Sequence, residues 1–485
     1  MNRALTRVAA FLGVLLIVLV ANLTYVTVIK GPSYAANPAN RRVLFHDYSR
    51  ERGEIVVGGA LIATSEPVDD QLKYQRIYSE GPLYAPVTGY DSLYYGTSGL
   101  ERAENPVLSG DDDRLFANRV TDLLKGRDPR GGNILLTLSK AAQQAAFTAL
   151  GNRRGAVVAL DPKTGAILAA VSTPSYDPNA LSSHDTDAIQ QAYADYQNDP
   201  SSPMVNRALT QTYPPGSVFK VVVAAAGLAQ GLAPDTQIPA PDSITLPDST
   251  TTLANYGGER CGDGQTDTLA HALAISCNTA FAQLGMSIGT PALRAEAAAF
   301  GIDDQPFTMP LYVARSTIGP VPDQGALAQS SIGQRDVQIT PLQGAMIAAT
   351  VANGGTLMAP YLVAQQQAPN LATLPGGAAK PAARSTAMTA DQAAALTQMM
   401  VGVVDGGTGT AAQIPGVPVA GKTGTADIAA GEPPHAWFIG FAPANDPKIA
   451  VAVLIENGGV SGSETTGGLA AAPVAADVIK AYLGL

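Results

Sequence analysis

The N-terminal segment of the chain constrains its folding more than any other feature. Residues 8–29 read VAAFLGVLLIVLVANLTYVTVI, which is 22 residues without a charged side chain. At 1.5 Å per residue, a helix of this length crosses a hydrocarbon layer of about 30 Å. Arg3 and Arg7 precede the segment. Because positive charge collects on the cytoplasmic side of membrane segments, we expect the rest of the chain to lie outside the cytoplasm.

A cleaved signal peptide is the alternative for this segment. Its apolar part is longer than the core of a usual signal peptide, and no convincing small-x-small cleavage site follows it. We therefore expect a single-pass anchor in the cell membrane. Residues 1–33 would form a cytoplasmic tip and the membrane span, and the catalytic part would be extracytoplasmic.

Composition limits the possible partners and cofactors. The chain has 485 residues, 46% of them hydrophobic, which is enough for two or three domains. Its 40 acidic and 30 basic residues give a net charge of −10 without a Lys/Arg stripe, so nucleic acid is not an expected partner. The four histidines are isolated, and no His-Glu-x-x-His motif or cysteine pair at zinc spacing occurs. We expect no metal and no cofactor.

Changes in the length and spacing of the apolar runs divide the rest of the chain into two parts. A polar linker and a small, irregular, β-containing domain are expected over residues 34–154, where apolar runs are short. From residue 155 the runs GAVVAL and AILAAV, joined by the turn DPKTG, predict a buried hairpin. Ala-rich helical stretches and further strands follow. Residues 155–485 are therefore expected to form a large α/β domain.

The two cysteines, Cys261 and Cys277, are 16 positions apart in the part of the chain expected to lie in an oxidising space. They could close one disulfide loop. Two buried free thiols are the alternative, because the sequence does not give the separation of the two Cα atoms. A disulfide would tether the loop before Ser276 and help to position that residue.

A candidate nucleophile lies in QTYPPGSVFKVVVAAAGLAQG, residues 211–231. The Pro-Pro-Gly triplet ends at position 216, and the apolar run after it predicts a buried helix from Ser217 to Gly231. Lys220 is about one turn beyond Ser217, on the same face. Burial lowers the pKa of a lysine because the charged form loses its hydration, so neutral Lys220 could accept the Ser217 proton. The alternative is a capping serine with a snorkelling lysine.

Ser276-Cys277-Asn278 is the only Ser-x-Asn sequence of the chain. Alternate side chains of a short irregular segment can point the same way, which would bring Ser276 and Asn278 to one side. Taken alone, the motif would be an ordinary loop or helix cap.

Residues 420–427 read AGKTGTAD and precede a strand-like run, AWFIGFAP. A strand edge with Lys422 and the hydroxyls of Thr423 and Thr425 suits a carboxylate peptide bound by strand addition, and Gly424 would allow its backbone to approach closely. The same Lys-Thr-Gly letters at 163–165 lie in the hairpin turn before Ser217. We expect that earlier triplet to be exposed and without function.

Ser-x-x-Lys, Ser-x-Asn and Lys-Thr-Gly occur here in the order typical of penicilloyl serine transferases. The chain resembles class B penicillin-binding proteins, in particular the actinobacterial penicillin-binding protein A group. Further matching stretches are residues 155–179, 340–355, 403–412 and 437–440 and, near the N-terminus, Arg52-Gly53-Glu54-Ile55 and residues 96–101. Two stretches depart from the family pattern. Residues 56–59, Val-Val-Gly-Gly, stand where Asp-Arg-Asn-Gly is frequent, and Gly333-Gln334-Arg335 replaces a common Gly-Gln-Gly.

The resemblance implies a transpeptidase domain with a central antiparallel sheet flanked by helices, and a pedestal domain of the dimerisation type before it. It also implies a peptidoglycan D,D-transpeptidase with roles in cell wall synthesis, cell division and cell shape. Ser217 would attack the carbonyl between the two terminal D-alanines of a stem peptide, and an amine of a neighbouring strand would resolve the acyl-enzyme. Lys220 would be the base, Ser276 would relay a proton to the leaving nitrogen, and Asn278 would orient Lys220 and the substrate amide.

The backbone N–H groups of Ser217 and Thr425 would form the oxyanion hole. Lys422 would depress the Lys220 pKa, and Thr423 and Thr425 would hold the substrate carboxylate. The implied partners are stem peptides ending in D-Ala-D-Ala and β-lactams that acylate Ser217. A membrane-embedded glycan polymerase of the SEDS type is the third implied partner, because no region before residue 155 resembles a glycan-polymerising domain.

Three alternatives share this fold or chemistry. Class A β-lactamases deacylate with a Glu in Glu-x-x-Leu-Asn, a run that does not occur here. A penicillin sensor would be expected to carry further membrane spans or a signalling domain. A D,D-carboxypeptidase differs only in whether water or an amine resolves the acyl-enzyme, so the motifs do not exclude it.

Overall fold

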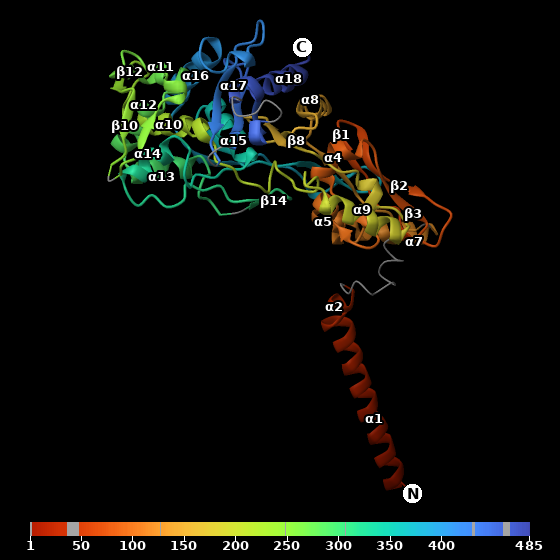
Figure 1. Ribbon diagram of the computed structural model, residues 1–485. Helices are drawn as coiled ribbons and strands as arrows, with labels where there is room; N and C mark the ends of the chain where they lie inside the picture. Colours follow the sequence, from red (N-terminus) through yellow and green to blue (C-terminus); the bar gives the residue numbers. More distant parts are fainter. Residues whose placement is uncertain are drawn as a thin grey trace.

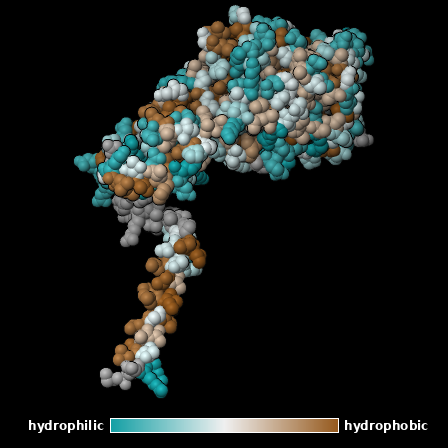
Figure 2. Space-filling view, turned by 180° about the vertical axis from the view of Figure 1, so that it is seen from behind, coloured by the Kyte–Doolittle hydropathy of each residue, from teal (hydrophilic) through white to brown (hydrophobic). Residues whose placement is uncertain are grey.

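The N-terminal segment forms a helix of its own. In the computed structural model, which describes residues 2–35, 48–126, 128–247, 249–305, 307–428, 432–458 and 466–485, α1 (Asn2–Thr24) continues through η1 (Tyr25–Ile29) to α2 (Gly31–Ala35). Figure 1 shows α1 extending away from the other elements. Leu5–Ile29 is long and apolar enough to cross a membrane, and no other helix in the described ranges is. Figure 2 shows this helix covered by apolar side chains.

The C-terminal part is built around a five-stranded antiparallel sheet with the strand order β19-β20-β21-β7-β8. Its strands are β7 (Gly155–Leu160), β8 (Ile167–Thr173), β19 (Ala420–Ala426), β20 (His435–Ala442) and β21 (Ile449–Ile455). β7 and β8 form the predicted hairpin. Every residue of β20 and β21 is buried because helices cover both faces of the sheet.

Alternating side chains of the strands divide the core of this domain in two. Ala156 and Val158 of β7 pack on the side of α15 (Pro341–Ala352). Val157 and Ala159 pack on the opposite side, where α8 (Lys140–Leu150) and α18 (Ala472–Leu483) lie. A sheet covered on both faces requires continuous apolar runs, which explains why GAVVAL shows no polar alternation.

Beyond α15 lies a helical region, seen on the left in Figure 1. It consists of α10 (Lys220–Ala229), α11 (Leu269–Ala274), α12 (Asn278–Ile288), α13 (Thr290–Ala299), α14 (Gln324–Ser331) and α16 (Ala390–Asp405). Four two-stranded sheets accompany it: β9 (Gln237–Pro239) with β12 (Thr266–Thr268), β10 (Ser243–Thr245) with β11 (Thr252–Ala254), β13 (Phe307–Thr308) with β14 (Tyr312–Val313), and β15 (Thr356–Met358) with β18 (Ala383–Thr386).

The N-terminal domain is built around a second sheet, with the order β17-β16-β6-β1-β2-β3. Its strands are β1 (Ile55–Val57), β2 (Ala60–Pro67), β3 (Tyr74–Tyr78), β6 (Asn133–Leu136), β16 (Val363–Gln367) and β17 (Thr373–Ala378). The remaining elements nearby are β4 (Asp91–Ser92), β5 (Gly96–Thr97), α4 (Gly81–Thr88), α5 (Gly99–Ala103), α6 (Asn105–Leu108), α7 (Phe116–Leu124) and α9 (Thr186–Asn198).

The two parts of the chain interlock across the expected boundary between residues 154 and 155. β16 and β17 come from the C-terminal part of the chain, yet β16 pairs with β6 of the N-terminal part. Conversely, α8 lies before residue 155 and packs against the five-stranded sheet. Residue 155 is the first residue of β7. Nevertheless, each of the two packed units contains an element from the other side of this position in the sequence.

A buried ionic cluster holds the N-terminal domain together. Glu101 is fully buried and accepts hydrogen bonds from Arg52 Nε at 2.6 Å and Arg76 Nε at 2.7 Å. Although burial alone would raise it, the charges of Arg76 and Arg52 hold the pKa of Glu101 below its usual value. The cluster joins the chain before β1 to β3 and α5, so two of the stretches that match the family pattern, 52–55 and 96–101, meet here.

Replacing Glu101 by Gln should strongly destabilise the N-terminal domain. The buried Arg76 guanidinium would lose its carboxylate partner, and Arg52 would keep only Asp91, at 3.6 Å. Loss of one partner of a buried pair typically costs about 3–5 kcal/mol. Glu80→Gln is the matched control, because the Glu80–Lys140 ion pair is half exposed and such pairs contribute under about 1 kcal/mol. Thermal unfolding of the purified protein in detergent measures both. Equal melting temperatures for the two variants would contradict this role.

Candidate active site

The three sequence motifs lie on separate elements that meet at one point. Ser217 belongs to the 3₁₀ turn η4 (Gly216–Phe219), which leads directly into α10 at Lys220. Ser276 lies between α11 and α12, and Asn278 is the first residue of α12. Lys422 lies on β19. The predicted helix from Ser217 is therefore present, but its first turn is tighter than an α-helix.

The Lys220 ammonium group lies among acceptors from the Ser-x-Asn motif. Its Nζ is 2.6 Å from the Ser276 carbonyl oxygen, 2.8 Å from Asn278 Oδ1 and 3.3 Å from Ser276 Oγ. The residue is completely buried. The predicted common orientation of Ser276 and Asn278 is found, and both face Lys220.

Lys422 approaches the same serine hydroxyl from the sheet. Its Nζ is 2.9 Å from Ser276 Oγ and 2.9 Å from the Thr423 carbonyl oxygen. Lys422 is completely buried, and in the described part of the chain no carboxylate pairs with it or with Lys220. The Ser276 hydroxyl thus lies between two buried amines.

Burial without a counter-charge changes the protonation of both lysines. Burial lowers the pKa of Lys422 to about 7. Burial, and then the charge of Lys422, lower the pKa of Lys220 well below its ordinary value. Both effects favour the neutral form of Lys220, whose lone pair can accept a proton.

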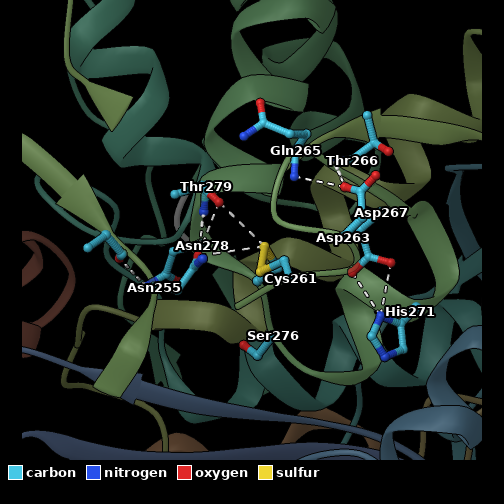
Figure 3. The surroundings of a disulfide bond; sticks show 12 residues. Asn255, Cys261, Asp263, Gln265, Thr266, Asp267, His271, Ser276, Asn278 and Thr279 are labelled. Carbon is cyan, nitrogen blue, oxygen red and sulfur yellow. Dashed lines mark hydrogen bonds and ion pairs between the residues drawn. A yellow bond between two sulfur atoms is a disulfide. The ribbon is translucent and has the colours of Figure 1, made fainter. Parts of the chain in front are cut away.

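Ser276 is held in an uncommon backbone conformation. Its φ is +64°, in the left-handed region that non-glycine residues rarely adopt. The structure joins the next residue, Cys277, to Cys261 in a disulfide with the Cα atoms 6.1 Å apart, and both cysteines are buried. On the other side, Asn255 Oδ1 accepts a hydrogen bond from Thr279 N at 3.0 Å. Figure 3 shows the disulfide between these contacts and the segment with Asp263 and Asp267, the second of which lies on β12.

β19 is the edge strand of its sheet, so one side of its backbone faces the site. The hydroxyl oxygens of Thr423 and Thr408 are 2.5 Å apart, and Thr425 Oγ1 accepts from Gly467 N at 3.4 Å. In the earlier Lys-Thr-Gly triplet, Lys163 is exposed and pairs with Asp446, while Thr164 is half-buried and Gly165 is buried.

Gly424 differs from its expected role. A Cβ atom there would lie 2.7 Å from the Pro215 carbonyl oxygen and 2.9 Å from Val218 Cγ2, so protein atoms rather than an open cleft occupy the space beside it. At Gly216, a Cβ atom would lie 2.5 Å from the Thr425 carbonyl oxygen. The two glycines allow the turn with Ser217 to pack directly on β19. Gly424 is needed for this packing and not for the approach of a ligand.

A cleft of about 630 Å³ opens over this arrangement. Five of the predicted catalytic and substrate-binding residues line it: Ser217, Ser276, Asn278, Thr423 and Thr425. The two cysteines of the disulfide line it as well. Lys220 and Lys422 lie beneath its floor. Within the described ranges, no hydrogen bond joins the Ser217 hydroxyl to Lys220, although such contacts in empty sites often shorten only when substrate binds.

Comparison with known proteins agrees with this geometry. The model of the penicillin-binding protein transpeptidase domain matches residues 155–480, and that of the penicillin-binding protein A dimerisation domain matches residues 52–134. The chain belongs to the penicillin-binding protein transpeptidase family. The first of these matches begins at the first residue of β7.

Relatives in this family match the whole chain. It is 50% identical to the peptidoglycan D,D-transpeptidase PbpA of Mycolicibacterium smegmatis, over 100% of this chain and 99% of the relative. The PbpA of Mycobacterium tuberculosis is 48% identical over the same shares. The structure of M. tuberculosis penicillin-binding protein A as a penicillin G acyl-enzyme complex is 50% identical, with a TM-score of 0.85, and covers 90% of this chain and 100% of its own.

Some residues of the site were not predicted individually. Thr408 contacts Thr423 and lies within 403–412, which matched the family pattern without an assigned role. Trp437 Nε1 donates to the Pro214 carbonyl oxygen at 3.0 Å and so holds the turn before Ser217. Its place in the matching stretch 437–440 was the one available signal. Asn255 lies in a polar loop that gives no signal at all.

Lys422→Met should change how stability depends on pH. Between about pH 7 and 10.5 folded Lys422 is neutral while the unfolded lysine is still protonated, so the unfolded chain binds more protons and stability rises with pH. The methionine removes this contribution. Lys163→Met changes the exposed lysine of the earlier Lys-Thr-Gly triplet, so this variant should retain the pH-dependent contribution of Lys422. Melting temperatures at pH 7.0, 8.0 and 9.0 test this, and parallel curves for Lys422→Met and the wild type would disprove it.

Removing the disulfide should affect both stability and the site. A closed loop of this size is worth about 3 kcal/mol in the chain-entropy account, so Cys261→Ser/Cys277→Ser should lower the melting temperature by several degrees. Because Cys277 adjoins Ser276, acylation by labelled penicillin should also slow. An unchanged acylation rate would limit the disulfide to a stabilising role. Mass spectrometry should find neither thiol alkylated unless reductant is added.

Proposed function

We propose that the chain is a peptidoglycan D,D-transpeptidase that cross-links stem peptides through an acyl-enzyme on Ser217 and releases D-alanine. The supporting observation is that Lys220 Nζ contacts both Ser276 and Asn278, and Lys422 Nζ contacts the Ser276 hydroxyl, at 2.6–3.3 Å beneath the cleft that Ser217 lines. In this proposal the activity contributes to cell wall synthesis, cell division and cell shape.

Acylation begins with the transfer of the Ser217 proton to neutral Lys220. Ser217 Oγ bonds to the carbonyl carbon of the penultimate D-alanine. The Ser276 hydroxyl, 3.3 Å from Lys220 Nζ and 2.9 Å from Lys422 Nζ, passes its proton to the nitrogen of the departing D-alanine as the C–N bond breaks. Ser276 then takes the former Ser217 proton from Lys220, which returns Lys220 to its neutral form. The depressed Lys220 pKa supports this role, since a lysine of ordinary pKa is protonated at pH 7 and cannot act as a base.

The edge of β19 is suited to binding the peptide. Its free side can pair with an extended substrate, and the Thr423 and Thr425 hydroxyls lie where they can bind the terminal carboxylate. The Ser217 and Thr425 backbone N–H groups form the proposed oxyanion hole. The close packing of Gly216 on Thr425 supports this pairing, and loss of one such donor typically costs about 3 kcal/mol in the barrier.

The chain faces outward from the membrane in this proposal. The apolar helix Leu5–Ile29 is the anchor, and Arg3 and Arg7 stay in the cytoplasm. A membrane-embedded polymerase of the SEDS type would supply the glycan strands. β-Lactams would acylate Ser217 as mimics of the D-Ala-D-Ala terminus, in line with the imipenem and penicillin G acyl-enzyme complexes of M. tuberculosis penicillin-binding protein A.

Ser217→Ala should abolish covalent labelling by fluorescent penicillin while leaving the fold intact. Ser287→Ala, which changes an exposed serine on α12 of the same domain, is the matched control and should label like the wild type. Gel fluorescence after denaturation measures the adduct. A stable adduct on Ser217→Ala would refute the assignment of the nucleophile.

The reaction itself is tested with a stem-peptide donor and a free amine acceptor. Transpeptidation predicts an aminolysis product and released D-alanine, both absent with Ser217→Ala. Hydrolysis alone, even at a high amine concentration, would instead identify a D,D-carboxypeptidase. Mass spectrometry distinguishes the two products directly.

A further inference from the structure

Arg335 has a backbone conformation that is unfavourable for its residue type. The turn Gly333-Gln334-Arg335 follows α14, and Gly333 and Arg335 have φ values of +71° and +65°. Glycine adopts this region freely, whereas an arginine there is strained. The turn is also one of the two departures from the family pattern, in which glycine is common at this third position. Sites that retain such strain tend to be functional.

The turn is attached to the residue before the nucleophile. Gly216 N donates a hydrogen bond to the Gly333 carbonyl oxygen at 2.9 Å. A Cβ atom on Gly333 would lie within 2.0 Å of the Gly216 carbonyl oxygen, so the contact leaves no space for another residue. The position of Arg335 is therefore fixed relative to Ser217, and both line the same cleft.

Arg335 gives the cleft its exposed positive charge. Lys220 and Lys422 lie beneath the surface, so Arg335 is the single cationic side chain among the described residues that line the cleft. Glu259 and Asp427 are the acidic ones. Because these carboxylates repel anions, a second anionic ligand group, in addition to the terminal carboxylate assigned to Thr423 and Thr425, would bind beside Arg335.

The one ion pair that the structure shows for the Arg335 guanidinium group leaves N–H donors for a ligand. Arg335 Nε lies 3.4 Å from Asp336 Oδ2, and its side chain is about one-third exposed. An exposed pair between neighbouring residues contributes little. Within the described ranges its side chain makes no further ion pair. A guanidinium fork matches a carboxylate with two parallel hydrogen bonds.

We propose that Arg335 forms a carboxylate subsite for the donor stem peptide and recognises a side carboxylate upstream of the D-Ala-D-Ala terminus. The inference rests on the proposed transpeptidase function and adds specificity to it. The terminal carboxylate is assigned to Thr423 and Thr425, so Arg335 would distinguish donors that carry a free acidic group from donors in which that group is an amide.

The test compares two donor peptides that differ only in whether this carboxylate is free or amidated. Full-length protein in detergent is used as wild type, Arg335→Gly and Arg335→Lys. We expect Arg335→Gly to reduce kcat/KM for the free-carboxylate donor by about 10- to 100-fold, mostly through KM, as for loss of a charged hydrogen bond. The amidated donor should change less than about threefold. Arg335→Lys should restore part of the difference, since it keeps the charge without the fork.

Two controls separate this subsite from a structural role. Acylation by benzylpenicillin, whose side chain is uncharged, should be nearly unchanged in Arg335→Gly. The melting temperature should stay the same or rise, because glycine removes the backbone strain. Equal losses with both donors, or no loss with either, would overturn the proposal. If the wild type processes neither donor but is still acylated, the proposed transpeptidase function is at fault instead.

Discussion

The burial of two lysines around one serine hydroxyl, with no carboxylate partner among the described residues, is the constraint on which the site depends. Water would hold both amines charged, and the described part of the protein removes that water without placing a carboxylate beside them. The result is a low pKa for Lys220 and one of about 7 for Lys422. Such an arrangement is unfavourable by itself, since both the lost hydration and the mutual repulsion oppose the charged forms. The surrounding structure must therefore hold it in place.

The surroundings do so through several independent connections. Ser276 is fixed by its hydrogen bonds to both lysines and by the disulfide at the next residue. The turn with Ser217 is held on β19 by the close contacts at Gly216 and Gly424. Because β19 belongs to a fully covered sheet, the lysine on it cannot move without disturbing the core. The proposed nucleophile, Ser217, and the proposed base, Lys220, are thus held in place by the packing of the domain.

Much of this could be predicted, because it depends on local patterns. The apolar N-terminal helix, the hairpin of β7 and β8 and the helix after Ser217 each follow from runs of apolar residues and turn signals. The pairing of β16 with β6 could not, since strands more than 200 residues apart share no local signal. Gly424 was misjudged for a related reason: a glycine indicates that space is short, but not which neighbour takes it. Thr408 and Asn255 became recognisable only through their contacts.

The sequence by itself determined the types of chemical group available, their order along the chain and the length of the apolar N-terminal helix. The order of the motifs and the turn around Lys163 already separate the two Lys-Thr-Gly triplets, but only the tertiary structure decided that the lysine of the second triplet is buried against Ser276. Lys163 is exposed, whereas Lys422 is completely buried beside Ser276. Residue type is a local property of the chain. Burial and distance, which set a pKa and align a proton path, exist only after distant segments have packed together.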